Sequence, residues 1–283
     1  MTEVLAVITD IREHNPFAFW GAVSEAGYEW AKGKDGKQHL IPRREPGIGY
    51  RACKPHSALF LEFAKMPPSK EAIQNFASLY GDLYSRYGAG HSGTRKDGTV
   101  ASGASLGTWA KESGDMRVLV GLWRDIQQRQ IAALKKIIKW GEREVGYEIK
   151  TPLRERSATL AHADIPATGF ARFGPKDVVL PARCALQLEI NLRLAEHSTV
   201  AQLSWTTDTR DTSGDYYQRI VFQPPNLLAA MWLQFAQAVT GEFQLKVCEG
   251  CGKHFQAGPG GRRADATTCS DVCRQRKRRN NSA

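Results

Sequence analysis

The first 57 residues alternate short apolar runs with polar turns, a pattern typical of β-strands. The apolar runs cover residues 4–11, 28–32, 39–42 and 49–54. A Gly-Lys-Asp-Gly stretch between the second and third runs has the composition of a tight turn. Residues 1–57 are therefore predicted to form a β-rich N-terminal subdomain.

From residue 58 the apolar spacing changes to that of helices, and residues 58–241 are predicted to form a mainly helical body. Ser69 is a side chain of the kind that caps a helix, and apolar residues recur every three or four positions after it. The longest predicted helix covers residues 116–140. Residues 182–197 alternate as in a strand but are mostly strong helix formers, which favours a helix.

Polar segments interrupt this body. Residues 88–107 are rich in Gly, Ser and Thr and are predicted to form a flexible loop, and residues 152–181 also have loop composition. Two strands are predicted at 200–205 and 216–222, followed by an apolar helix over 226–239. The chain is therefore predicted to be an α+β protein with a mostly helical main body.

Composition agrees with a globular protein that buries a large core. The chain has 283 residues, of which 42% are hydrophobic and 24% charged. No apolar run approaches the roughly 20 residues that span a bilayer. The first nine residues lack the basic start and cleavage site of a signal peptide. We expect a soluble, cytoplasmic protein that does not enter a membrane.

Four of the six cysteines fall close together near the C-terminus, at Cys248, Cys251, Cys269 and Cys273. The spacing is C-x2-C followed, after 17 residues, by C-x3-C. Without an export signal, this spacing favours a metal site over disulfides. Four thiolates complete a tetrahedron, so the sequence predicts one structural zinc ion with no open position.

The residues around each cysteine pair suit metal binding. Gly250 lies between the cysteines of the first pair and Gly252 follows them, and both glycines allow the backbone to fold tightly around an ion. Ser270 and Asp271 are typical of a helix start, which would place Cys269 and Cys273 on one helical face. Four apolar residues of the preceding helix are expected to pack this finger against the body: Leu228, Met231, Trp232 and Phe235.

The C-terminal motif resembles a bacterial treble-clef zinc finger of the CGNR type. The resemblance lies in Cys248-Glu-Gly-Cys251-Gly-Lys-His-Phe255, then Arg262-Arg263, then Cys269-Ser-Asp-Val-Cys273-Arg-Gln-Arg. It implies a zinc knuckle, a short hairpin and a helix with the last two ligands, and it implies a DNA-binding regulator. Cys273 is followed by Arg-Gln-Arg, so the Cys-Gly-Asn-Arg signature itself is absent. The finger is predicted to cover residues 242–283.

The same region holds much of the positive charge. The chain has 39 Lys and Arg against 29 Asp and Glu, a formal net charge of +10, and half of it lies in residues 242–283. A basic helix next to a zinc site can follow a phosphate backbone, and no aromatic residue in the tail is placed to stack bases. Duplex DNA is therefore the expected partner, contacted through Arg262, Arg263, Arg274, Arg276, Lys277, Arg278 and Arg279.

Two other functions remain open. The finger could be purely structural in a protein-interaction or assembly module, which predicts a homo-oligomer or a protein partner. Glu148-Ile149-Lys150 matches half of a metal-dependent nuclease signature, with Asp125 upstream. No G-x-S-x-G or Walker motif occurs, and the histidines are scattered. We therefore expect no catalytic residues and a binding protein rather than an enzyme.

Overall fold

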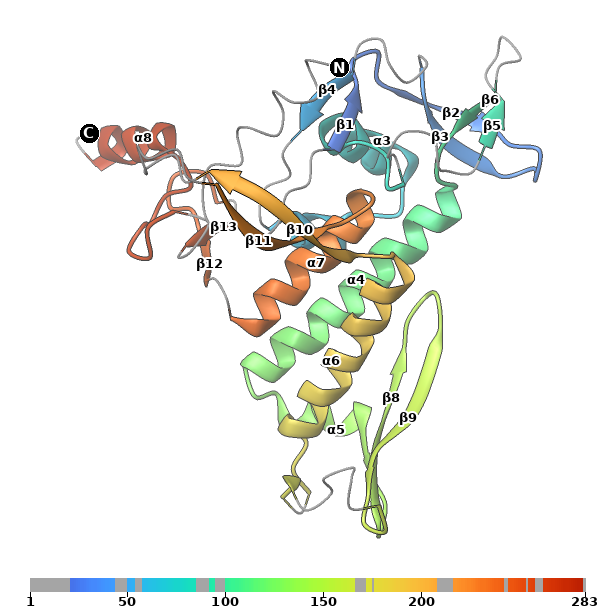
Figure 1. Ribbon diagram of the computed structural model, residues 1–283, viewed down its shortest axis with the longest axis vertical. Helices are drawn as coiled ribbons and strands as arrows, with labels where there is room; N and C mark the ends of the chain where they lie inside the picture. Colours follow the sequence, from blue (N-terminus) through green and yellow to red (C-terminus); the bar gives the residue numbers. More distant parts are fainter. Residues whose placement is uncertain are drawn as a thin grey trace.

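A computed structural model shows an α+β protein made of helices and small antiparallel sheets (Figure 1). The predicted strand over residues 4–11 lies outside the part of the chain that the structure describes. The described residues are 21–43, 50–53, 58–84, 92–94, 100–165, 172–174, 176–207, 216–241, 244–252, 254–257 and 262–281.

Two antiparallel strand pairs form the start of the described chain. Strand β1 (Gly21–Ser24) pairs with β4 (Tyr50–Cys53), and β2 (Tyr28–Lys32) pairs with β3 (Gln38–Pro42). The turn between β2 and β3 contains Gly36 at φ +75°, a left-handed conformation that glycine adopts without strain. The strands predicted at 28–32, 39–42 and 49–54 are therefore confirmed.

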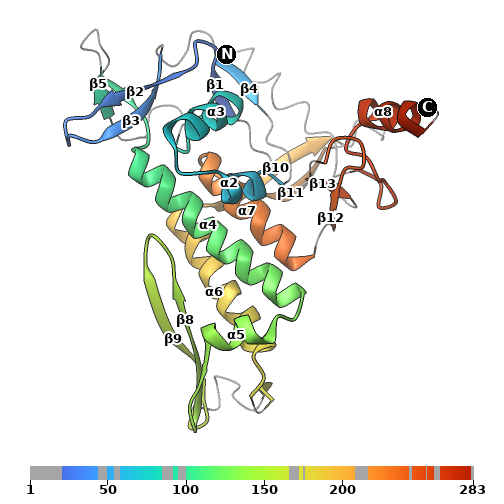
Figure 2. The same ribbon diagram turned by 180° about the vertical axis from the view of Figure 1, so that it is seen from behind.

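Helices pack side by side to form the centre of the body (Figures 1 and 2). These are α2 (Leu59–Lys65), α4 (Leu106–Gln127), α6 (Val179–Glu196) and α7 (Leu227–Thr240), and α3 (Lys70–Tyr80) packs against β1 and β2 next to them. Caps position several of them: Ser69 accepts a hydrogen bond from the amide of Ala72, and Asn226 accepts one from Ala229 at 2.9 Å. The predicted helices after Ser69, over 182–197 and over 226–239 are confirmed.

Helix α7 lies in the middle of the main core. Phe235 stacks on Phe60 of α2 with ring centroids 5.2 Å apart, and it also meets Trp123 of α4. Because α7 is covered on nearly every side, its residues are apolar all round. The expectation that this helix packs the finger against the body is wrong, since all four expected docking residues belong to the core of the body: Leu228, Met231, Trp232 and Phe235.

The helix predicted over 116–140 is broken. Helix α4 starts earlier and ends at Gln127, and Arg129 takes φ +50° before the short α5 (Ile131–Ile137). The chain then enters β7 (Ile138–Trp140). No glycine or proline marks this break, so the spacing of apolar residues predicted one continuous helix across it. The apolar residues instead serve two separate elements of the same core.

The last strand of a three-stranded sheet replaces part of the loop predicted over 152–181. Strands β7, β8 (Glu144–Lys150) and β9 (Glu155–His162) pair in that order. Val145, Tyr147 and Ile149 of β8 are buried and alternate with more exposed residues, the period expected of a half-buried strand. The polar β9 lacks such a pattern, because both of its faces are largely exposed.

The segment predicted as a flexible loop over 88–107 contains paired strands. Strands β5 (Ser92–Thr94) and β6 (Val100–Ser102) form a small ladder, and Ser105 caps α4. Gly103, directly after β6, lies against the backbone of β3. A Cβ at this position would lie 1.7 Å from the carbonyl oxygen of Leu40. The loop prediction is wrong here because small residues allow this close backbone approach.

The last strands of the body match the prediction. Strand β10 (Val200–Thr207) pairs with β11 (Tyr216–Gln223) over their full lengths. Helix α7 follows them and leads to the finger. Among the described helices, none is both long and apolar enough to cross a lipid bilayer.

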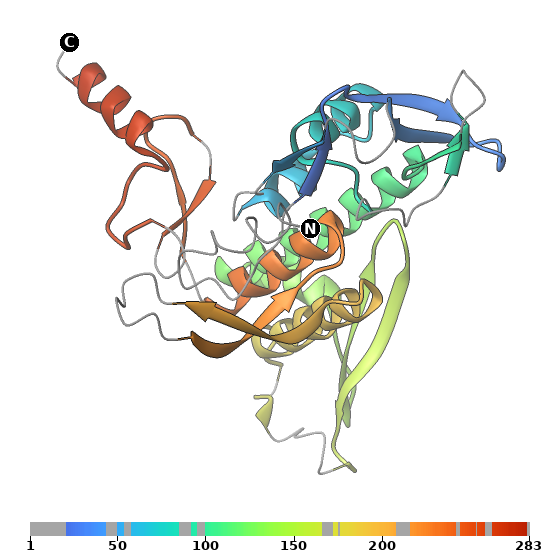
Figure 3. The same ribbon diagram turned by 45° about the horizontal axis from the view of Figure 1, so that its top comes forward.

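The finger is a separate small unit at one end of the molecule. It consists of the hairpin β12 (Gln244–Val247) and β13 (His254–Ala257), a loop, and helix α8 (Asp271–Asn281). Figure 3 shows α8 extending away from the helices of the body, with the C-terminus at its far end. The buried residues of the finger form a cluster of their own, distinct from the main core.

Candidate metal centre and basic helix

The four predicted cysteine ligands converge. Cys248 and Cys251 lie in the turn of the β12–β13 hairpin, and Cys269 and Cys273 lie at the start of α8. Their sulfur atoms all lie within 4.8 Å of one another. Cys269 Sγ is 3.6 Å from both Cys251 Sγ and Cys273 Sγ. A tetrahedral ion with metal–sulfur bonds of about 2.3 Å holds its sulfurs about 3.8 Å apart, so this cluster fits one metal ion.

Two glycines allow the hairpin turn to approach α8. Gly252 has φ +70°, which an L side chain rarely adopts. Gly250 packs directly against Cys273: a Cβ at this position would lie 2.8 Å from the Cys273 carbonyl oxygen. The amide of Cys269 donates a hydrogen bond to Cys248 Sγ at 3.2 Å, and Ser270 Oγ accepts one from the amide of Cys273 at 3.2 Å. These backbone contacts hold the two cysteine pairs next to each other.

The electrostatics of the cluster separate its thiols. Burial raises the pKa of Cys248, but hydrogen bonds from the amides of Cys269 and Gly250 and from neighbouring thiols outweigh it and lower the pKa to about 6. Burial and the adjacent sulfurs raise the pKa of Cys269 to about 12. Such opposed shifts arise because Cys248 accepts hydrogen bonds as a thiolate, whereas Cys269 donates to its neighbours as a thiol. A bound cation removes that repulsion and favours four thiolates.

The finger has too few buried apolar groups to stabilise itself by packing. Its buried cluster consists of Cys248, Phe255, Ala257 and Cys273, with Ala266 and Cys269 packed against it. Two of the four buried members are candidate ligands. A unit of this size depends on a metal or a similar constraint for its fold. The cysteine cluster therefore has the position and chemistry of a structural metal site.

The predicted basic residues lie on two sides of α8. Five of them line a hollow of about 590 Å³ between the loop after β13 and the helix: Arg262, Arg263, Arg274, Lys277 and Arg278. Arg276 and Arg279 point elsewhere, because the roughly 100° step between helical residues places them on the opposite face. All of the arginines on α8 are exposed. The structure thus brings five predicted contacts together and leaves two on the outer face.

Acidic residues pair with basic residues that line this hollow. Asp271 accepts a hydrogen bond from Arg262 at 2.8 Å and lies 3.3 Å from an Nη of Arg274. The hydrogen bond from Arg262 holds the pKa of Asp271 below its usual range. Lys277 pairs with Glu249 of the hairpin turn, and this contact ties α8 to the turn that holds Cys248. Among the described residues, no ion pair involves Arg276 or Arg279.

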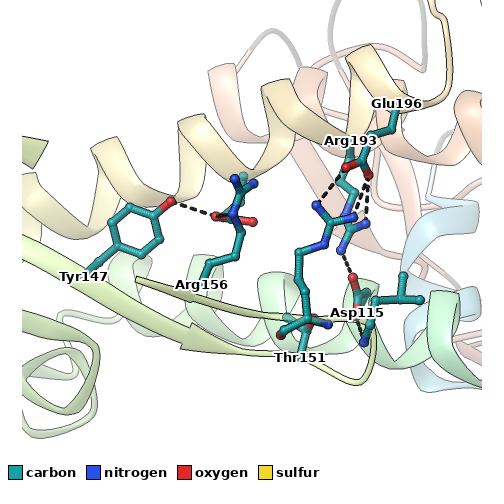
Figure 4. Close-up of polar contacts among 9 residues, drawn as sticks. Asp115, Tyr147, Thr151, Arg156, Arg193 and Glu196 are labelled. Carbon is teal, nitrogen blue, oxygen red and sulfur yellow. Dashed lines mark hydrogen bonds and ion pairs between the residues drawn. The ribbon is translucent and has the colours of Figure 1, made fainter. Parts of the chain in front are cut away.

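A second polar cluster lies inside the body, and no sequence pattern predicted it. Arg193 of α6 pairs with Asp115 of α4 and also with Glu196 at 3.0 Å, and both Arg193 and Asp115 are almost fully buried (Figure 4). Asp115 also accepts a hydrogen bond from the amide of Leu153 at 3.0 Å. Because this amide belongs to the β8–β9 turn, the cluster joins that turn to two helices. A further hydrogen bond joins the sheet to α6: the hydroxyl of Tyr147 in β8 donates to Glu189 at 2.7 Å.

The half nuclease signature and the upstream Asp125 lie on different elements. Glu148 and Lys150 lie on β8, where Glu148 is 3.7 Å from Lys139 and 3.9 Å from Lys150. Asp125 lies on α4 and pairs with Arg124 at 3.8 Å. In the part of the chain that the structure describes, the four cysteines are the only group of three or more suitable side chains placed to share a metal ion.

Comparison with known proteins gives no relative. The chain matches no protein-family model, no curated protein and no solved structure. Function must therefore be inferred from the site itself.

Proposed function

We propose that this protein binds nucleic acid, with duplex DNA as the partner, and acts as a DNA-binding regulator. In this proposal one zinc ion held by Cys248, Cys251, Cys269 and Cys273 fixes the start of α8, and the basic residues of the finger contact phosphates. The observation that carries the proposal is the exposed basic helix beside the cysteine cluster, extending away from the body (Figure 3). Zinc suits the site because four cysteine sulfurs in tetrahedral spacing are its usual structural ligands.

The charge of the helix supports phosphate as the ligand. Five of the six residues at 274–279 are basic, and all of the arginines among them are exposed. A helical backbone presents these cations at a fixed spacing, so the backbone need not be ordered when they meet an array of phosphates.

A salt titration with a matched charge control tests the proposal. The five basic residues of α8 are changed to Gln together, and a control variant changes five exposed lysines of the body to Gln: Lys111, Lys135, Lys136, Lys139 and Lys150. Binding to a short labelled duplex is followed by fluorescence anisotropy. Neutralising about five phosphates predicts a slope of about −4.5 for log affinity against log salt concentration.

The expected result is a loss of affinity of about 100-fold or more in the helix variant, with a shallow salt slope, because most phosphate contacts are gone. The body control should stay within about threefold of the wild type, since its lysines lie outside the proposed interface. Both variants should retain about one zinc ion per chain. Equal losses in the two variants, or an affinity that salt does not change, would contradict the proposal.

A protein-interaction module is the second candidate, and one observation favours it. The finger exposes two aliphatic side chains, with Val247 57% and Val272 68% exposed. Apolar groups on so small a unit are available to a protein partner or to a second copy of the chain. Light scattering separates the two candidates: a stable oligomer that binds no duplex supports the module, and a monomer that binds duplex supports the first proposal.

A further inference from the structure

The hollow beside α8 has two walls of different origin. One wall is the loop after β13, which contributes Arg262 and Arg263, and the other is the face of α8 with Arg274, Lys277 and Arg278. The cysteine cluster joins these walls, because Cys269 ends the loop and Cys273 lies in the first turn of the helix. The candidate metal site therefore lies where the two walls meet.

The charge of the hollow favours an anion. Five cationic side chains line it, against the two carboxylates of Asp265 and Asp271, so an excess of three positive charges remains. The hydroxyl-bearing residues Thr267 and Thr268 also line it and can donate hydrogen bonds. A lining of arginines, a lysine and hydroxyls matches the chemistry of a phosphate group.

The side chains already converge on an oxyanion. A guanidinium from each wall reaches the same Asp271 carboxylate, from Arg262 at 2.8 Å and from Arg274 at 3.3 Å. Arg263 is 3.2 Å from Asp265, and both of these side chains are highly exposed, at 88% and 73%. Exposed pairs of this kind are weak. A phosphate can therefore displace them at little cost.

We propose that this hollow binds a phosphate group of the nucleic-acid backbone, held by Arg263, Lys277 and Arg278 between the loop and α8. This inference rests on the proposed function, since the backbone phosphodiester is the expected ligand. The volume of the hollow, about 590 Å³, exceeds that of a phosphate alone and leaves room for an attached sugar. The inner face of α8 therefore meets the backbone, and Arg276 and Arg279 on the outer face contribute only long-range attraction.

Two matched double variants test the assignment of faces. The inner variant is Arg263→Gln with Arg278→Gln, and the outer variant is Arg276→Gln with Arg279→Gln. Each removes two positive charges from exposed side chains of the finger. We expect the inner variant to bind a labelled duplex at least about tenfold more weakly, with a salt slope shallower by about 0.9, because one phosphate contact is lost. The outer variant should stay within about threefold of the wild type.

The outcomes separate this inference from the proposed function. If both variants lose the same affinity, duplex binding stands but the hollow is not its phosphate site. If the wild type binds no duplex, the proposed function fails, and inorganic pyrophosphate then tests the hollow alone through the NMR shifts of the Thr267 and Thr268 amides. Saturable shifts in the wild type and the outer variant, but not in the inner variant, support the hollow. Absence of shifts in the wild type overturns it.

Discussion

The body and the finger use charge in opposite ways. In the body, Arg193 and Asp115 pair where their side chains are only 2% and 0% exposed, and the pair joins α4, α6 and the β8–β9 turn. In the finger, ion pairs lie at the surface, and Arg263 and Asp265 are 88% and 73% exposed. A buried pair is committed to structure, whereas exposed cations remain available to a ligand. The same residue types thus hold one region together and equip the other for binding.

The two regions also differ in what stabilises them. The body has a continuous core of aromatic and aliphatic side chains from all of its large helices. Among the described residues of the finger, the buried apolar cluster has four members, two of which are candidate metal ligands. Apolar burial therefore accounts for the body, and the proposed zinc ion accounts for the finger.

Removal of the metal should have the largest effect and should be confined to the finger. Structural zinc contributes about 10–16 kcal/mol in isolated fingers, so a strong chelator should unfold residues 244–281. All seven tryptophans precede residue 233, so their fluorescence reports on the body alone. Hydrogen exchange should show loss of protection in α8, while tryptophan fluorescence and its urea midpoint stay unchanged. Restoring zinc serves as the control, and a body that unfolds with the finger would contradict the separation.

Breaking the buried ion pair should give the next largest effect, confined to the body. Arg193→Met leaves the Asp115 carboxylate buried without its charged partner, which typically costs about 3–5 kcal/mol. Urea unfolding followed by tryptophan fluorescence measures this loss, and the zinc content should not change. Adding Asp115→Asn to the same chain removes the unpaired charge and should recover more than half of the stability. A single variant as stable as the wild type would show that the pair holds nothing together.

The contrast between these regions also explains what the sequence could predict. The cysteine spacing is local, so it identified all four converging side chains. Ser69 and Asn226 are likewise local signals, and both cap helices as side chains of their type should. In contrast, Asp115 and Arg193 look like surface residues in any window, because their burial depends on a partner helix far along the chain. The sheet β7–β8–β9 shares this problem, although the alternation of Val145, Tyr147 and Ile149 was a usable strand signal.

The free energy of unfolding of the body should depend on pH through a buried carboxyl group, unlike the exposed carboxyl groups of the finger. Burial raises the pKa of Asp82 to about 6, despite hydrogen bonds from the amides of Ala104 and Tyr84. The folded body therefore holds this proton more tightly than the unfolded chain does. Its stabilisation is complete below pH 3.8 and is lost as the pH rises to about 6, a change of about 3 kcal/mol.

The variant Asp82→Asn isolates this effect, because it does not titrate. The wild type should lose about 2 kcal/mol relative to the variant between pH 4 and pH 7 in urea unfolding followed by tryptophan fluorescence, since part of the change lies below pH 4. His197 should show the opposite trend: burial lowers its pKa to about 4, so its contribution is lost as the pH falls from 6.5 to 4. A His197→Gln control removes that opposing change. A stability difference that does not vary with pH would rule out titration of Asp82 in the fold.

The smallest effect should come from an ion pair of the finger. Lys277 and Glu249 pair with side chains 37% and 49% exposed, and such pairs contribute about 1 kcal/mol or less. Glu249→Gln should therefore weaken zinc retention against a competing chelator by no more than about fivefold. Asp265→Asn, which removes the still more exposed partner of Arg263, is the matched control and should have no measurable effect. If Glu249→Gln weakened zinc retention by more than about tenfold, the pair with Lys277 would hold α8 against the hairpin turn. Exposed charge in the finger would then share the structural role of the buried pair in the body.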